Sequence, residues 1–187
     1  MDKANDVALL WLASSVSDRP MVPGPWLPEP VAVGMPSNSM VAVIGYGMTE
    51  SGRVSDTLRQ VTLPVVSTRK CNSSYGGELN PDEVCAGKPY QKDACGGDSG
   101  GPLLLVEQDG TWLGAQVGVV SKGTGCPGDR GGVYASVAYH AEWIMKNVGA
   151  EGGRSIGVDA SSAGAVAPSA FAATAALLVT LAGMLRC

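Results

Sequence analysis

The chain has 187 residues, of which 45% are hydrophobic and 16% charged, and its formal net charge is -4. This size and balance fit a single globular domain, and the charge offers no basic footprint for nucleic acid. With 26 glycines and one phenylalanine, the composition favours turn-rich β structure with an aliphatic core over helix.

Five cysteines are spread along the chain at Cys71, Cys85, Cys95, Cys126 and Cys187. They form no Cys-x-x-Cys motif or Cys/His cluster, so no metal site and no cofactor are expected. Four cysteines in the body of the chain indicate two disulfides and an oxidising compartment. Residues 1–6 lack the basic start and apolar core of a signal peptide. The simplest interpretation is that the chain is truncated at its N-terminus.

The first predicted elements lie between residues 6 and 66. An apolar run over residues 7–12 predicts a buried strand directly after Asp6. Six prolines in residues 13–38 exclude regular helix or a central strand there. Residues 40–47, which end at a Gly-x-Gly turn, and the alternating residues 56–66 predict two further strands.

Residues 92–102, with the sequence KDACGGDSGGP, place Ser99 among glycines and are followed by an apolar run over 103–106. This pattern predicts a tight loop leading into a buried strand. Main-chain N–H groups of glycines can face a ligand, and a serine hydroxyl held among them can attack a carbonyl. The alternative is a flexible Gly/Ser linker, although linkers seldom carry a cysteine, two aspartates and an abutting strand. No Gly-Lys-Ser/Thr follows, which argues against a nucleotide-binding loop.

The remaining strands are predicted at residues 117–120 and 132–134. An amphipathic helix follows, because apolar residues recur at i, i+3, i+4 and i+7, at Ala141, Ile144, Met145 and Val148. His140, at the start of this helix, is expected at the surface.

The tail changes in character after Gly149. Residues 151–169 are small and polar, and residues 170–185 are almost wholly apolar. Small residues around 159–162, a short spacer and an apolar end indicate a GPI-attachment signal. The apolar part is shorter than the ~20 residues that a spanning helix needs. A marginal membrane anchor is therefore the second interpretation, and an error in the gene model the third.

Taken in order from residue 5 to about residue 148, these segments resemble the trypsin-like serine proteases of the chymotrypsin fold, with residues 92–102 similar to the nucleophile loop of that family. The resemblance implies an all-β chain with the second six-stranded antiparallel barrel of a double barrel, a C-terminal helix, and a first barrel that is largely missing. The resemblance divides the chain into four parts. These are the remnant last strand of the first barrel (1–12), the crossover between the barrels (13–39), the second barrel with its C-terminal helix (40–149), and the linker and tail (150–187). The strand at 7–12 is then an orphan without partners.

The resemblance also implies the catalytic roles. Ser99 would be the nucleophile and Asp6 the triad aspartate, and the backbone N–H groups of Gly97 and Ser99 would form the oxyanion hole. Asp98 would accept the N-terminal ammonium that activation creates in the family. For Asp6, the alternative is a polar residue that happens to precede a buried strand.

Asp93 would form the floor of the primary specificity pocket, where a buried carboxylate selects Arg or Lys. The alternative is a solvated loop acid. The pocket would be completed by Ser121, Gly123 and Gly132. Lys122 replaces a tryptophan usual beside the substrate backbone, which removes an apolar wall and adds a like charge near a cationic substrate.

Two disulfides are predicted, Cys71 with Cys85 and Cys95 with Cys126, the second joining opposite walls of the pocket. A third bridge of many family members is replaced on both sides by aliphatic residues, Val41 and Leu105. The joint loss of both cysteines supports the alignment, because the loss of one alone would leave a stray thiol.

The single histidine of the sequence, His140, cannot be the base, because the triad order would require it before the aspartate. Loss of the base costs on the order of 10⁶ in turnover. The resemblance thus implies a trypsin-like serine endopeptidase that cleaves after Arg or Lys, inactive in this form. The alternative is a non-catalytic homologue that acts as a binding or inhibitory protein. The expected partner is a polypeptide substrate or a protein inhibitor, and the expected location is extracellular, secreted or GPI-anchored, with membrane attachment through the tail.

Overall fold

The computed structural model describes residues 4–11, 13, 35–36, 39–126, 128–152 and 176–179 of the chain. The predicted crossover at 13–39 and the predicted tail at 150–187 therefore lie largely outside the described residues. The proposed domain boundaries in these regions remain predictions.

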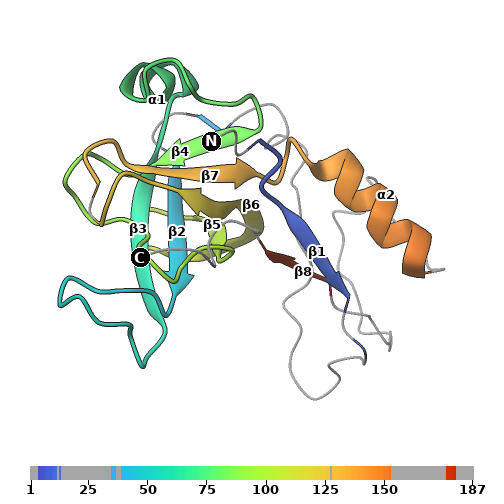
Figure 1. The fold of residues 1–187 in the computed structure, drawn as a ribbon. Coiled ribbons are helices and arrows are strands. Elements are labelled where there is room, and N and C mark those ends of the chain that lie inside the picture. The colour runs from blue at the N-terminus through green and yellow to red at the C-terminus, as the bar shows by residue number, and fades with distance from the viewer. Residues whose placement is uncertain are drawn as a thin grey trace.

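Six antiparallel strands close into a barrel, as the sequence predicted (Figure 1). Around the barrel the strands follow the order β2-β3-β4-β7-β6-β5. Their bounds are β2 Met40–Gly45, β3 Arg59–Val66, β4 Glu83–Ala86, β5 Pro102–Val106, β6 Trp112–Lys122 and β7 Gly132–Ser136. Closure leaves the barrel without a free edge, so each of its six strands has hydrogen-bonded neighbours on both sides.

The barrel interior is filled mainly by aliphatic side chains, as expected from a sequence with one phenylalanine. Its buried cluster consists of Val41, Val43, Leu63, Val65, Ala86, Leu103, Ala115, Val117, Val120 and Tyr134. Burial of this apolar surface is the main favourable contribution to folding.

The register of β2 and β5 bears on the missing third bridge. Val41 lies directly opposite Leu105 in this antiparallel pair. The two aliphatic residues thus occupy facing positions that a disulfide could join, which agrees with the joint replacement inferred from the sequence.

Both predicted disulfides are present, Cys71–Cys85 and Cys95–Cys126. Cys71 lies on a short helix that the sequence analysis missed, α1 (Thr68–Ser74), and packs with Cys85 and Val133. Ser67 caps this helix, since its side chain accepts a hydrogen bond from the Lys70 N–H. A helix this short and polar has no apolar stripe, so the capping residue Ser67 is the one feature of the sequence that could have indicated it.

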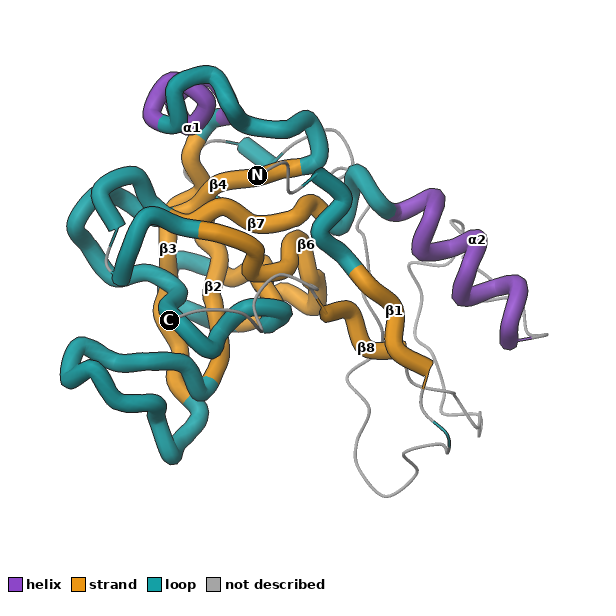
Figure 2. The backbone as a smooth tube through the Cα atoms, viewed as in Figure 1, coloured by secondary structure: helices purple, strands orange, loops and turns teal. Residues whose placement is uncertain are grey.

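The strand after Asp6 is β1 (Ala8–Trp11), and the expectation that it has no partner strand is wrong. It is not the fully buried strand that the apolar run predicts either, because Leu10 and Trp11 are exposed. It pairs antiparallel with β8 (Ala176–Val179), which belongs to the tail, beside the C-terminal helix α2 (Ala141–Gly152) (Figure 2). Val7 and Leu9 also pack on a second apolar cluster that contains Ile144 of α2. Apolar burial therefore docks this segment onto the barrel.

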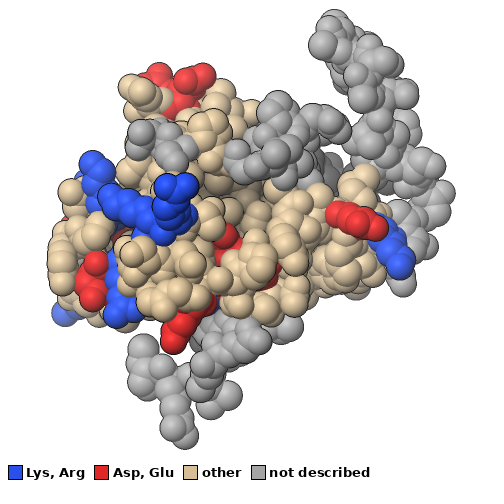
Figure 3. Space-filling model, turned by 90° about the horizontal axis from the view of Figure 1, so that it is seen from above, with Lys and Arg blue, Asp and Glu red and all other residues tan. Residues whose placement is uncertain are grey.

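Charged side chains of both signs lie on the face seen from above in Figure 3, where most Lys and Arg atoms gather at the left and one further cation lies at the far right beside an acidic side chain. Among the described residues, no helix has the length and apolar character needed to cross a membrane.

Candidate active site

The loop between β4 and β5 presents Ser99 to solvent. Two hydrogen bonds make the loop tight: the Asp98 N–H donates to the Cys95 carbonyl at 3.0 Å, and the Gly101 N–H donates to the Asp98 carbonyl at 2.8 Å. Gly97 has a φ of +95°, a backbone conformation that favours glycine. Within the described part of the chain, no hydrogen bond uses the N–H of Gly97 or Ser99. These two amides are therefore available to an incoming oxyanion.

The loop is fixed to the end of β6. The Gly100 N–H donates to the Val120 carbonyl at 3.0 Å, and the Val120 N–H donates to the Gly101 carbonyl at 2.9 Å. The register between β6 and β7 shifts between Val120 and Lys122, and such irregularities redirect side chains. Ser121 at this point is 5% exposed.

Ser121 connects the end of β6 to the segment that carries the predicted triad aspartate. Its hydroxyl donates to Asp6 Oδ2 at 2.7 Å, across 115 residues of sequence. The sequence analysis assigned Ser121 to the pocket and missed this contact with Asp6. An aspartate that merely precedes a strand would need no such buried hydroxyl, so the contact favours a positioned carboxylate at Asp6.

The Asp98 side chain lies in a cradle formed by the Gly-x-Gly turn at the end of β2. Its carboxylate accepts hydrogen bonds from the Gly47 N–H at 2.8 Å and the Cys95 N–H at 3.0 Å. A methyl group on Gly45 or Gly47 would overlap the carboxylate. The two glycines are thus required for the close approach of Asp98, a role the sequence analysis did not assign to them.

Asp93 lies in the same loop, partly buried, against the start of β7. Its Oδ1 accepts hydrogen bonds from the Ala94 N–H at 2.8 Å and the Tyr134 hydroxyl at 3.3 Å. Burial raises the pKa of Asp93 above that of a free aspartate, although both hydrogen bonds favour the charged form. Burial also holds the pKa of Tyr134 well above its ordinary value, so the phenol keeps its proton and donates. Asp93 is therefore not a freely solvated loop acid.

Of the other predicted pocket residues, Gly132 lies next to Asp93, whereas the described contacts do not place Gly123 beside it. A Cβ on Gly132 would stand 2.7 Å from Asp93 Oδ1, so only glycine leaves this wall open. A Cβ on Gly123 would meet nothing within 4 Å. The Cys95–Cys126 disulfide ties the loop of Asp93 to the chain that follows β6.

Lys122, which was expected to add a like charge near a cationic substrate, forms an ion pair. Its Nζ lies 2.6 Å from Glu83 Oε1, and the Glu83 side chain is 2% exposed. Glu83 also accepts hydrogen bonds from the main chain and side chain of Asn80. The added positive charge is thus compensated by a buried carboxylate.

His140 was expected at the surface, and this is wrong, because the residue is 5% exposed. Its ring makes an edge contact with Tyr139 at 5.2 Å between centroids, and its Nε2 lies 3.4 Å from Asp82 Oδ2. No hydrogen bond joins Ser99 to Asp6 or to a histidine among the described residues. The arrangement therefore combines an exposed serine hydroxyl with two available amides, and no hydrogen bond links that hydroxyl to a proton acceptor among the described residues.

Metal ligands are not gathered at this site. The part of the chain that the structure describes contains no group of three or more His, Cys, Asp or Glu side chains placed to hold a metal ion.

A closed six-stranded barrel that presents a serine on a glycine-rich loop is the architecture of a trypsin-like serine protease. The family model described as Trypsin matches residues 1–144. The match covers most of the chain, and the chain belongs to this family.

Curated relatives agree with this assignment. Trypsin-1 of Astacus astacus is 42% identical over 148 residues, which are 76% of this chain and 60% of the relative. Phenoloxidase-activating enzyme 1 of Spodoptera litura is 41% identical over 114 residues, 60% of this chain and 30% of the relative. Transmembrane protease serine 11C of Mus musculus is 37% identical over 150 residues, 78% of this chain and 34% of the relative. The chain thus spans about a third to three fifths of the length of these relatives.

The glycine cradle around Asp98 predicts that alanine at position 47 destabilises the protein more than alanine at position 96. Gly47→Ala should lower the free energy of unfolding by about 1–3 kcal/mol, because the new methyl group overlaps the Asp98 carboxylate. Gly96→Ala is the matched control, since its Cβ would meet only Met48 Cε, at 3.7 Å. Urea unfolding monitored by tryptophan fluorescence measures both, and equal stability of the two variants would contradict the cradle.

Proposed function

We propose that this chain carries the nucleophile, oxyanion hole and specificity pocket of a serine endopeptidase that cleaves polypeptides after Arg or Lys. The observation that carries the proposal is the exposed Ser99 next to two main-chain amides, those of Gly97 and Ser99 itself, that have no hydrogen-bond partner among the described residues. Membership of the trypsin family supports proteolysis as the reaction class.

In this reaction the Ser99 Oγ bonds to the carbonyl carbon of the scissile peptide while its proton passes to a base. The carbonyl oxygen becomes an oxyanion that accepts hydrogen bonds from the Gly97 and Ser99 amides, and each such donor contributes about 3 kcal/mol to transition-state stabilisation. The amine leaves with the proton, and water then releases the acyl group by the same steps. The Asp6 carboxylate, held by Ser121, would orient the base.

The sequence contains one histidine, and it is buried against Asp82. The chain as given is therefore expected to turn over substrate about 10⁶-fold more slowly than an intact triad. The same observation favours the second candidate function, a non-catalytic homologue that binds polypeptides or inhibits a protease. The two candidates differ in whether any longer product of the gene provides a base next to Ser99.

Specificity for Arg and Lys is supported by Asp93. This carboxylate is partly buried, has a raised pKa, and faces a wall that only glycine keeps open. A cationic side chain would give the buried charge an ionic partner, whereas a neutral one would not.

A fluorophosphonate probe tests the proposed nucleophile. The serine Oγ bonds to phosphorus, fluoride leaves, and the serine proton goes to the base. The 187-residue chain should label slowly or not at all, and a longer product that supplies a histidine should label at Ser99, which mass spectrometry of the modified peptide can locate. Ser99→Ala is the control. A longer product with a histidine before Asp6 that fails to label would favour the binding protein.

Binding of p-aminobenzamidine tests the pocket without any need for turnover. Asp93→Asn should weaken binding by at least about 30-fold, which corresponds to about 2 kcal/mol for the loss of a partly buried charge pair. Affinity of the unsubstituted chain should fall as the pH is lowered through the raised pKa of Asp93, because only the carboxylate pairs with the amidinium. Asp56→Asn, at an exposed aspartate, is the control and should bind normally.

The same variant has a predicted effect on stability. A raised pKa in the folded state means that Asp93 contributes stability below the pKa of the unfolded chain and loses it as the pH rises through the folded pKa. At neutral pH, Asp93→Asn should therefore unfold at a higher temperature than the unsubstituted chain while it binds the amidine less well. A variant that loses both stability and binding would instead indicate a damaged loop.

We place the protein outside the cell, either secreted or attached to the cell surface through a GPI anchor. The two disulfides support an oxidising compartment, and the small and apolar residues of 159–185 support the anchor signal. In the structure, by contrast, Ala176–Val179 of this tail pair with β1. Phosphatidylinositol-specific phospholipase C should release the protein from cells that make it. A mature protein that still contains residues 176–187 by mass spectrometry would contradict GPI attachment.

A further inference from the structure

A buried polar cluster lies behind the site, where the segment of Asp6 meets the barrel. Asp82, just before β4, is 3% exposed, and His140 faces it with Nε2 3.4 Å from Asp82 Oδ2. His140 Nε2 has no hydrogen-bond partner among the described residues. The proposed reaction uses neither side chain, so their burial calls for another explanation.

The same Asp82 oxygen holds the segment that carries Asp6. Oδ2 accepts a hydrogen bond from the Asn5 N–H at 2.6 Å, across 77 residues of sequence. Asn5 has a φ of +60°, a left-handed conformation that asparagine tolerates better than most residues. The chain then turns, with the Val7 N–H donating to the Asn5 carbonyl at 2.8 Å. Asp6 thus lies at a bend whose first residue is anchored by Asp82.

Glu83, the residue next to Asp82, is linked to Asp6 from the side of β6. Glu83 pairs with Lys122, and Lys122 follows Ser121, whose hydroxyl donates to Asp6. The two adjacent acids therefore close a ring of contacts around Asp6, one through the main chain of Asn5 and one through the end of β6.

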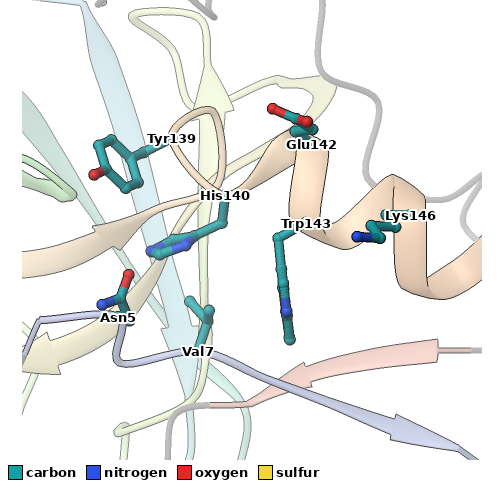
Figure 4. A pocket seen from close by; sticks show the side chains of 7 residues that line it. All are labelled: Asn5, Val7, Tyr139, His140, Glu142, Trp143 and Lys146. Atoms are coloured by element: carbon teal, nitrogen blue, oxygen red, sulfur yellow. The ribbon is translucent and has the colours of Figure 1, made fainter.

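Packing alone does not fix this bend. A cavity of about 560 Å³ borders the segment, and it is lined by Asn5, Val7, Tyr139, His140, Glu142, Trp143 and Lys146. Figure 4 shows the His140 ring extending towards Asn5, and the Trp143 ring standing on the other side of Val7. Since close packing is absent on the cavity side, the charge-assisted hydrogen bond from Asn5 to Asp82 has a large share in holding the bend.

We propose that Asp82 is a positioning residue for Asp6: its buried carboxylate, faced by His140, anchors the Asn5 amide and so sets the place of the Asp6 carboxylate against Ser121. The part that concerns catalysis rests on the proposed function, whereas the anchoring itself does not. Asparagine at position 82 would keep an acceptor for the Asn5 N–H but remove the charge. Alanine would remove both the acceptor and the charge.

The test is NMR spectroscopy of the isotopically labelled 187-residue chain with Asp82→Asn and Asp82→Ala. In Asp82→Ala, amide exchange at Asn5 and Val7 should rise about tenfold, and the carboxyl carbon resonance of Asp6 should move because its contact with Ser121 loosens. In Asp82→Asn, exchange should stay within about threefold of the unsubstituted chain, because the amide oxygen still accepts from Asn5. The ring resonances of His140, the single imidazole of the chain, should move in both variants.

Amides of β2 and β6 in the barrel should exchange as before, and Asp109→Asn, at a fully exposed hairpin acid, should change none of these signals. Unchanged exchange at Asn5 in Asp82→Ala, or an equal rise across the barrel, would overturn the proposal. If Asp82→Ala does not fold, Asp82→Ser takes its place with the same expected result. Failure of both to fold would also overturn it, because Asp82 would then be needed by the barrel itself. None of these signals depends on Ser99, so failure of the proposed protease chemistry would leave the result unaffected.

Discussion

Three consecutive residues at the end of β6 hold the whole site together. Val120 exchanges hydrogen bonds with the loop of Ser99, Ser121 donates to Asp6, and Lys122 pairs with Glu83. The register between β6 and β7 shifts between Val120 and Lys122. At such an irregularity, successive side chains need not point to opposite faces of the sheet. A strand of the barrel, rather than a loop, thereby fixes the segments that the proposed chemistry must bring together.

The buried and partly buried acids of the site are compensated to different degrees. Asp98 accepts two main-chain N–H groups, and Glu83 has a cation and an asparagine. Asp93 has one main-chain N–H and the phenol of Tyr134, and burial raises its pKa in spite of these two hydrogen bonds. A carboxylate that is only partly compensated in the free protein gains most from a cation brought by a ligand. Asp93 is thus the acid at which a cationic side chain is proposed to bind.

Local motifs predicted the elements and the residue types of the site, but not its long-range contacts. The glycine-rich loop and the barrel strands could be inferred because each leaves a pattern within a few residues. The Cys95–Cys126 disulfide joins residues 31 apart and was inferred from the family resemblance. The contacts of Ser121 with Asp6 and of Asp82 with Asn5 span 115 and 77 residues. No periodicity encodes such pairs, and the burial of His140 likewise depends on a segment far away in sequence. The prediction of an orphan strand was wrong for the same reason, because β1 pairs with β8 and its segment packs on the cluster that contains Ile144, both far away in sequence.

Lys122 shows how a long-range contact alters a specificity argument. Considered alone, a lysine in place of an apolar wall should repel an Arg or Lys substrate. Its ammonium lies 2.6 Å from a carboxylate that is itself 2% exposed, so the pair carries no net charge and its field at a substrate falls to that of a dipole. The repulsion expected from Lys122 is therefore largely cancelled, and the proposed selectivity for a cationic side chain rests on Asp93 alone. What the replacement does change is the wall itself, because a polar ion pair stabilises an apolar substrate side chain far less than an aromatic ring would.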